Sequence, residues 1–333
     1  MTGMRQRLQR GVILLAAAAF LVGLLAPSGA AALTKVKVGS SPLISYAPIF
    51  VAIEKGFYKE EGLEVELINF ASGAKMISAL ATGDIQVAAG SASAGLFNSI
   101  AKGADFRIVA DKGQIRPGYG FVQLIIRKDL LDSGAIKDVQ DLAGRRVASH
   151  AKGIINDYIL HYIAKNKGLD VSKVNLVYMA PPKIFQALQT KSIDAAVTVE
   201  PWTVRAEKEG VAVRFLPADK IPELQKLQVA EILYSGKFIR EEEEVGRKFM
   251  RAYLKGIKYF NARGMQENEM LDIIGKYTKV PQEMIKASIP FYLDNDGKVL
   301  VESVSALQDY FFDQGFIKQK LPMEKVVDLR FLK

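Results

Sequence analysis

The chain has 333 residues, 49% of them hydrophobic, which is enough to bury a sizeable core and usually to form two lobes or domains. Its formal net charge of +9 comes from charges of both signs scattered along the chain, so it gives no indication of nucleic-acid binding. The absence of cysteine excludes disulfides and the lipid-bearing cysteine of a bacterial lipoprotein.

The N-terminus has the pattern of an export signal. Three arginines in the first ten residues precede an apolar run from Val12 to Leu25, and small residues follow at Ala30–Ala32. The apolar run is about 14 residues long, shorter than the roughly 20 that a membrane-spanning helix needs. We therefore predict a signal peptide at residues 1–32, cleavage near Ala32, and a mature protein in the periplasm.

From residue 35, short apolar strands alternate with amphipathic helices, which is typical of an α/β fold with parallel strands. In the first series, strands are expected at 36–39, 63–67, 85–89 and 106–110. Helices are expected between them: one has Pro48 in its first turn and ends at Gly56, one is capped by Ser72 and stops at Gly83, and one runs to Gly103.

A second series follows Gly144. Its strands are expected at 146–149, 174–179, 193–199 and 211–216, with helices at 154–167 and 182–190. The helix–strand unit at 77–88 matches the unit at 185–196, with Ala, Leu, Thr, Ile and Ala at equivalent places. This repeat predicts one architecture for both halves, and the remainder from about 238 is expected to be helical.

Motifs for catalysis are missing. The chain has two histidines, no G-x-S-x-G turn, no phosphate-binding glycine loop, and no cluster of His or Cys that could hold a metal. His161 follows Asp157 by one helical turn, which favours a pair on a helix surface. We expect no catalytic residue, no metal and no cofactor.

A ligand is expected beside the carboxyl ends of the strands, where open α/β sheets bind their ligands. Two such sheets facing each other form a cleft that can close by a hinge motion. The loops at these ends supply the candidate ligand-binding residues: Ser41, Tyr46, Ser72, Gly73, Gly90, Ser91, Ser93, Gln114, His150, Lys152, Gly153, Ile154, Glu200 and Trp202.

Each candidate has a structural alternative. The Gly and Ser residues can let backbone N–H groups approach an anion, or they can simply turn the chain and cap helices. Tyr46 and Trp202 can stack on a flat ligand or belong to the core. Lys152 favours an anionic ligand, whereas Glu200 can hold a cationic group or stabilise a hinge.

One segment resembles a known family. Ala52–Val65, read as AIEKGFYKEEGLEV and preceded by Pro48, is similar to the opening signature of the nitrate/sulfonate/taurine-type binding proteins. That family also includes binders of the pyrimidine precursor of thiamine. Further matches follow at Ala79–Ile85, although Gln86 stands where Asp is usual, and at Asp141–Val147, Ile193–Ala195 and Glu200–Trp202.

The resemblance implies a type II periplasmic-binding fold, which is α/β with two lobes, a hinge and an interlobe ligand cleft. Lobe 1 would comprise 33–122 and 231–333, and lobe 2 would comprise 123–230. Two strands would cross between them, near Phe121–Ile126 and Ile232–Tyr234. It further implies the monomeric substrate-binding component of an ABC importer, which delivers a small organic or inorganic anion of the sulfonate, nitrate or taurine type to an inner-membrane permease.

The chain departs from the family at Ile154. In other members, the glycine that corresponds to Gly153 is often followed by Ser or Thr, whose hydroxyl contacts an anion. This leaves open a neutral heteroaromatic ligand such as a thiamine pyrimidine precursor. A pyrimidine-synthase-like enzyme is disfavoured, because that enzyme has a cysteine-rich motif whereas this chain has no cysteine and carries an export signal. A solute-sensing receptor module would need an attached membrane span or signalling domain.

Overall fold

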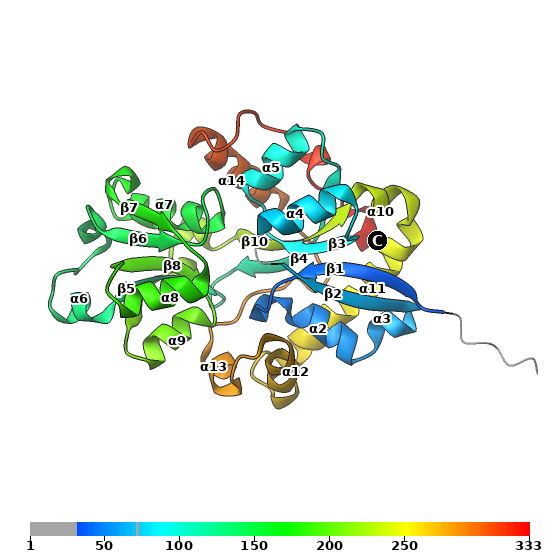
Figure 1. Cartoon of the computed structure of the whole chain (residues 1–333), viewed down its shortest axis with the longest axis horizontal. Coiled ribbons are helices and arrows are strands. Elements are labelled where there is room, and N and C mark those ends of the chain that lie inside the picture. Colours follow the sequence, from blue (N-terminus) through cyan, green and yellow to red (C-terminus); the bar gives the residue numbers. More distant parts are fainter. Residues whose placement is uncertain (1–31, 71–72) are drawn as a thin grey trace, which may run out of the picture. The chain divides into compact units, whose positions relative to one another are not determined.

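The computed structural model describes residues 32–70 and 73–333 (Figure 1). Nearly all of the predicted signal peptide, and the predicted ligand residue Ser72, lie outside these described residues. Across the described ranges, no helix combines the length and apolarity that a membrane span requires. The strands form two five-stranded sheets.

The first sheet has the strand order β2-β1-β3-β10-β4. Its strands are β1 (Thr34–Ser40), β2 (Leu63–Asn69), β3 (Val87–Gly90), β4 (Phe106–Ile115) and β10 (Leu227–Ser235). Strand β1 pairs in parallel with β2 and β3, whereas β10 runs antiparallel to β3 and β4. The carboxyl ends of β1 and β3 therefore meet at the same edge of the sheet.

The second sheet has the order β7-β6-β8-β5-β9. Its strands are β5 (Val122–Arg127), β6 (Arg146–Ser149), β7 (Asn175–Tyr178), β8 (Ala195–Val199) and β9 (Ala212–Pro217). Strand β6 is parallel to β7 and β8, and β5 is antiparallel to β8 and β9. The two sheets thus share one order, second-first-third followed by an antiparallel strand, which confirms the common architecture predicted from the internal repeat.

Helices cover both faces of each sheet (Figure 1). Those of the first sheet are α2 (Ala47–Glu54), α3 (Phe57–Glu60), α4 (Gly73–Thr82), α5 (Ala94–Ala101), α10 (Gly236–Glu241), α11 (Glu243–Arg263), α12 (Asn268–Thr278), α13 (Gln282–Ala287) and α14 (Val301–Asp313). Those beside the second sheet are α6 (Lys128–Asp132), α7 (Ile155–Asn166), α8 (Pro181–Gln189) and α9 (Trp202–Lys208). Helices α4 and α11 lie on opposite faces of the first sheet, and α7 and α8 on opposite faces of the second.

Helix α11 shows why these residues form this fold. Acidic residues Glu243 and Glu244 occupy its first turn, where the helix dipole favours negative charge. Its apolar stripe is buried, and Gly256 lets the helix pass close to α2, because a Cβ atom there would lie 2.4 Å from the carbonyl oxygen of Pro48. The helical remainder predicted from about 238 is confirmed.

Two strands differ from their predicted bounds. β4 continues to Ile115 rather than ending near residue 110, and β10 spans 227–235 with every residue buried. Asp111, Lys112 and Glu231 lie inside these strands, and charged residues at such places hide a strand from pattern recognition. β5 pairs within the second sheet and β10 within the first, so the chain passes between the sheets along 116–121 and 218–226.

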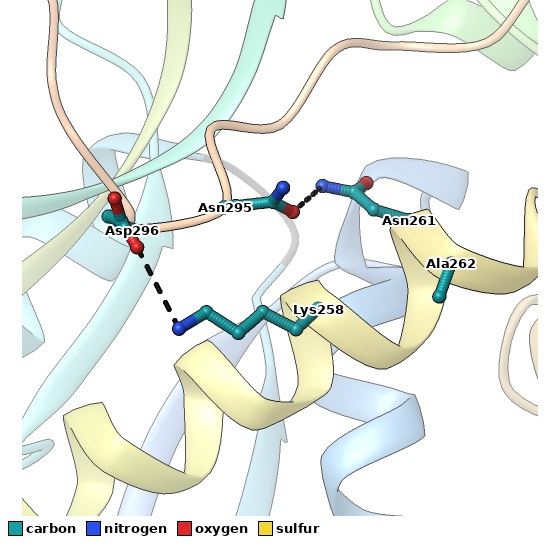
Figure 2. Close-up of a pocket in the computed structure, with 5 residues that line it drawn as sticks. All are labelled: Lys258, Asn261, Ala262, Asn295 and Asp296. Carbon is teal, nitrogen blue, oxygen red and sulfur yellow. Dashed lines mark hydrogen bonds and ion pairs between the residues drawn. The ribbon is translucent and has the colours of Figure 1, made fainter.

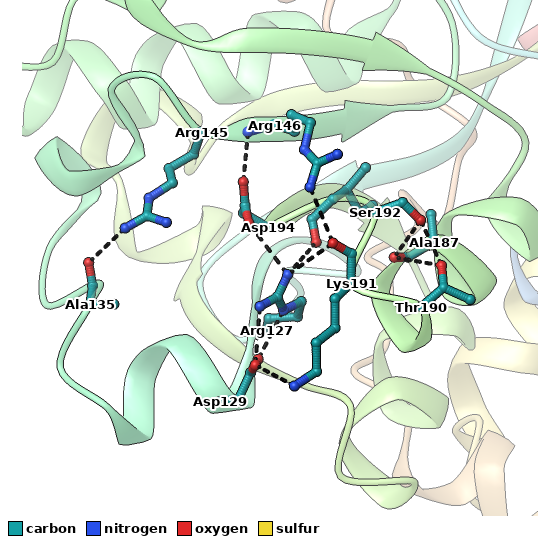
Figure 3. Close-up of polar contacts among 11 residues, drawn as sticks. Arg127, Asp129, Ala135, Arg145, Arg146, Ala187, Thr190, Lys191, Ser192 and Asp194 are labelled. Atoms are coloured by element: carbon teal, nitrogen blue, oxygen red, sulfur yellow. Dashed lines mark hydrogen bonds and ion pairs between the residues drawn. The ribbon is translucent and has the colours of Figure 1, made fainter.

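A polar network ties three strands together at the edge of the second sheet where β6 and β8 begin (Figure 3). The guanidinium of Arg127 donates to Asp129 Oδ1 at 2.9 Å and to Asp194 Oδ1 at 3.4 Å. The other oxygen of Asp194 accepts the backbone N–H of Arg146 at 2.9 Å. This network lies at the edge opposite the carboxyl ends of β6 and β8, so it supports the sheet rather than the predicted ligand loops.

Candidate functional site

The loop after β1 places Tyr46 in the core of the first sheet. Its ring stacks on Phe50 with centroids 6.2 Å apart, and its hydroxyl donates to the carbonyl oxygen of Ala89. Burial raises the pKa of Tyr46, with hydrogen bonding to Ser41 as the opposing effect. The ammonium of Lys112 lies 4.1 Å from the ring centroid, so one face of Tyr46 meets a buried charge.

The loop after β3 uses its polar groups within the protein. The Ser91 hydroxyl donates to the carbonyl oxygen of Val229 at 2.6 Å, and Ser93 caps α5 by accepting the N–H of Leu96 at 3.2 Å. Gly90 ends β3, and a Cβ atom there would contact Leu233 at 3.4 Å. These contacts correspond to the structural alternative named above for the small residues, in which they turn the chain and cap helices. Gly73 begins α4 with no atom within 4 Å of its Cβ position.

The loop after β6 carries four predicted ligand residues. His150 Nε2 lies 2.9 Å from Thr198 Oγ1, and burial lowers the pKa of His150 to about 4. Lys152 is exposed, with its ammonium 5.4 Å from the ring centroid of Phe316. Gly153 has a left-handed φ of +71° and donates its N–H to Asp157 Oδ2 at 2.8 Å, and Ile154 precedes the first turn of α7.

These loops of the two sheets meet directly. The N–H of Ala94, at the start of α5, donates to the carbonyl oxygen of Gly153 at 2.9 Å. A Cβ atom on Gly153 would lie 2.8 Å from that of Ala94, a distance that real side chains do not tolerate. The structure therefore brings Ser93 and the 150–154 loop together.

Two predicted residues, Gln114 and Glu200, are held by contacts within the protein. The amide of Gln114 donates to the carbonyl oxygen of Lys298 at 3.1 Å and accepts from Arg116 Nε at 3.0 Å. Glu200 pairs with Arg214 at 2.7 Å and also accepts the N–H of Ile289 at 3.3 Å. The paired carboxylate of Glu200 fits the alternative in which Glu200 stabilises a hinge better than the one in which it holds a cationic group of a ligand.

Trp202, the single tryptophan, is half-buried at the start of α9. Its ring lies 6.4 Å from that of Phe185, and the guanidinium of Arg205 sits over it at 5.6 Å. Trp202 thus packs at the edge of the second core. The expected pair of His161 and Asp157 is not formed, because the carboxylate of Asp157 accepts hydrogen bonds from Ser149 and Gly153. The ring of His161 instead packs against that of Tyr310, with centroids 5.1 Å apart.

The structure brings together a group that is not among the candidate ligand-binding residues named from the sequence, which we call the buried charge cluster: Asp111, Lys112 and Glu231. The ammonium of Lys112 donates to Ser45 Oγ at 3.0 Å. Glu231 accepts the N–H of Ala92 through Oε2 at 2.7 Å. Burial raises the pKa of Glu231 and lowers the pKa of Lys112. One signal was available, since Glu231 interrupts an otherwise apolar run from Val229 to Leu233.

A separate surface cavity of about 520 Å³ lies between α11 and the loop before α14 (Figure 2). It is lined by Lys258, Asn261, Ala262, Asn295 and Asp296, none of which was a predicted ligand residue. Asn261 Nδ2 donates to Asn295 Oδ1 at 2.8 Å, and Lys258 lies 3.7 Å from Asp296. The described ranges contain no group of three His, Cys, Asp or Glu residues able to hold a metal ion.

Two sequence relatives illustrate the likeness to known proteins. A protein of Brachyspira hyodysenteriae, provisionally named an ABC transporter periplasmic binding protein, is 28% identical over 215 residues, which is 61% of this chain and 60% of the relative. The match therefore spans three fifths of that relative's length. The taurine-binding periplasmic protein of Escherichia coli is 30% identical over 154 residues, 46% of this chain and 45% of that protein.

Solved structures show the same fold. The alkanesulfonate-binding protein SsuA from Xanthomonas axonopodis pv. citri, bound to MOPS, matches with a TM-score of 0.71 and 17% identity, covering 90% of this chain and 99% of SsuA. The desulfurization enzyme DszB matches with a TM-score of 0.63 and 14% identity, covering 90% and 97%. At these identities the likeness shows the fold alone, and that fold serves binding proteins and an enzyme.

The family itself is shown by sequence. Residues 44–264, about two thirds of the chain, match the family model described as NMT1/THI5 like. This stretch contains the resemblance noted above and most of the predicted ligand residues, from Tyr46 to Trp202. The type II periplasmic-binding fold predicted from the sequence is confirmed, and the chain belongs to the NMT1/THI5-like family.

Proposed function

We propose that this protein is the periplasmic substrate-binding component of an ABC importer and performs no catalysis. It captures a small organic or inorganic anion of the sulfonate, nitrate or taurine type and delivers it to a permease in the inner membrane. The observation that carries this proposal is the direct contact of the two sheets' ligand loops, in which Ala94 donates to Gly153. Ligand capture between these loops would explain why they meet.

The lobes of this mechanism are the two sheets with their helices, close to the predicted bounds of 33–122 with 231–333 and of 123–230. Val122, in β5, then belongs to lobe 2, and residues 227–230, in β10, belong to lobe 1. Two connections join the two lobes, so rotation about 116–121 and 218–226 would open and close the cleft. The signal peptide is removed near Ala32, which releases a monomer into the periplasm. The named relatives support this assignment, since one is provisionally named an ABC transporter periplasmic binding protein and another is a taurine-binding periplasmic protein.

A neutral heteroaromatic ligand is the second candidate. It is favoured because the backbone N–H groups that could bind an oxyanion already donate hydrogen bonds to other groups of the protein. The N–H groups of Ala92, Ala94, Leu96 and Gly153 all donate within the protein. Under this alternative, a thiamine pyrimidine precursor would be the solute.

A thermal-shift screen of protein recovered from the periplasm tests the proposal. The panel holds nitrate, alkanesulfonates, taurine and thiamine precursors, and the protein is unfolded, washed and refolded first to remove any bound solute. A true ligand at about 100 times its dissociation constant adds about 2.7 kcal/mol to the free energy of unfolding. Stabilisation by sulfonates or nitrate supports the anion class, and stabilisation by a precursor alone selects the second candidate.

No stabilisation by any compound would contradict both solute classes. The mass of the same periplasmic protein tests the export proposal. The expected mass is that of a chain that begins at Leu33. If the protein is found only in the cytoplasmic fraction and its mass includes residues 1–32, the export proposal is contradicted.

A further inference from the structure

Strand pairing places one buried carboxylate at the ligand-binding edge of the first sheet. Glu231 of β10 lies opposite Gly90, the last residue of β3, and opposite Asp111 of β4. Its side chain is fully buried, and the loop above it begins with the small residues Gly90, Ser91 and Ala92. Ligands of open α/β sheets bind beyond this end of the parallel strands. Glu231 therefore faces the region where a solute is expected.

One oxygen of this carboxylate has no hydrogen-bond partner in the described part of the chain. Oε2 accepts the N–H of Ala92 at 2.7 Å, whereas Oε1 is buried without a hydrogen bond from any described residue. Leaving a buried polar atom unpaired costs about 1–3 kcal/mol, and more for a charged group. Native proteins seldom keep such an atom without a use, so a missing donor is indicated at Oε1.

The surrounding charges are unbalanced. Asp111 already accepts three donors, the N–H groups of Gly113 and Asp294 and the amide of Gln228. Lys112 is the single cation of the buried charge cluster, and its ammonium is directed to Ser45 Oγ at 3.0 Å. Two carboxylates and one ammonium leave a net negative site when all three are ionised.

Titration of the buried charge cluster agrees with this imbalance. Burial raises the pKa of Glu231 to about 8, so its carboxyl holds a proton near neutral pH when no cation is beside it. Other titratable groups around the cluster are the phenols of Tyr46 and Tyr253, which stay neutral because burial raises the pKa of each, and the carboxyl of Asp294. Burial, together with the negative charge of Asp294, raises the pKa of Asp111 to about 6. A cation brought by a ligand would replace the proton.

Resting on the proposed function, we infer that Oε1 of Glu231 binds a cationic N–H group of the solute. The transported anion then also carries an amine, so its chemical class is a small zwitterion such as an aminosulfonate or amino acid. Glu200, the carboxylate first considered for this role, is already paired with Arg214 at 2.7 Å. Lys112 is a positioning residue that favours the ionised form of Glu231.

Matched solutes that differ only in the amine test this inference. Isothermal titration of the protein compares taurine with ethanesulfonate, and β-alanine with propionate. We expect the amine-bearing member of a pair to bind at least tenfold tighter. At pH 7.5 its binding should release a proton, detected as a binding enthalpy that changes with the ionisation enthalpy of the buffer.

Two variants separate ligand recognition from structure. Glu231→Gln keeps the shape and the bond from Ala92, and is expected to abolish the preference for the amine while leaving the amine-free solute within threefold. Glu244→Gln on the exposed face of α11 is the matched control and is expected to preserve the preference. Thermal unfolding of each variant checks that it is folded.

The outcomes distinguish this inference from the proposed function. Equal binding of both members of each pair, or an amine preference that survives Glu231→Gln, would overturn the inference while the importer role stands. If Glu231→Gln alters stability but not preference, Oε1 binds a structural water, and the inference also fails. If no solute of either kind binds, the proposed solute class and the inference resting on it both fail.

Discussion

The N–H of Ala94 donates a 2.9 Å hydrogen bond to the carbonyl oxygen of Gly153, and thereby joins a helix of the first sheet to a loop of the second. The Cα atom of Gly153 lies so close to Ala94 that an added Cβ atom would be 2.8 Å from the Ala94 Cβ. The absence of a side chain at 153 is therefore a condition for this contact. Ala94 also begins α5, whose preceding residue Ser93 caps the helix.

Gly153→Ala is expected to hold the two loops apart and to lower solute affinity by about tenfold. Gly144→Ala is the matched control, because Gly144 has a similar φ of +75° but no atom within 4 Å of its Cβ position. Both variants bear a left-handed strain of about 1–2 kcal/mol. Small-angle scattering with and without ligand, together with titration calorimetry, measures the effect. Equal affinity in the two variants would contradict the prediction.

The ligand-free protein is expected to lose stability with rising pH because of Glu231. A carboxyl with a raised pKa in the folded state stabilises it fully below its ordinary value of 4.5, and this stability is lost as the pH rises through about 8. Lys112 acts oppositely, since its pKa is lowered to about 7. Comparison with Glu231→Gln isolates the carboxyl.

Urea unfolding between pH 5 and 8.5 measures this difference. Glu231→Gln is expected to gain on the order of 2 kcal/mol over the wild type as the pH rises across that range, because the neutral amide needs no proton. Parallel stability curves for the two proteins would show that Glu231 ionises in the folded state as easily as in the unfolded chain.

Acid is expected to destabilise the protein partly through His150. Burial lowers its pKa to about 4 from an ordinary value of 6.5, so its contribution to stability is present above pH 6.5 and is lost as the pH falls through 4. His150→Asn should flatten the stability curve between pH 6.5 and 4, as followed by thermal unfolding. A slope unchanged by the substitution would rule out His150 as the titrating group.

Arg127→Met is expected to destabilise the protein by about 3 kcal/mol, because it leaves the nearly buried carboxylate of Asp194 without its cation (Figure 3). Lys128→Met is the control, since its pair with Asp132 is exposed and contributes less than about 1 kcal/mol. Urea unfolding measures both. A loss in Arg127→Met no larger than in the control would show that the network of Figure 3 contributes little.

Several features followed from the sequence alone because they depend on local patterns. The period-two alternation of 63–67 and the glycine stops of the early helices predicted β2, α2 and α4 with bounds close to those observed. The repeat between 77–88 and 185–196 predicted one architecture for both halves, because equivalent helix–strand units pack by the same rules, and the two sheets do share one strand order. The sequence Ala52–Val65 carried the most specific part of the family resemblance.

Only the tertiary structure decided which polar groups remain free for a solute. Glu200 stood out in sequence as a carboxylate beside Trp202, but folding brings Arg214 and the N–H of Ile289 to it. Glu231 is 139 residues from its partner Ala92, so no local pattern revealed that one of its oxygens is paired and the other is not. Local spacing determines helices and strands, whereas the pairing of buried charges depends on which distant strands the fold makes neighbours.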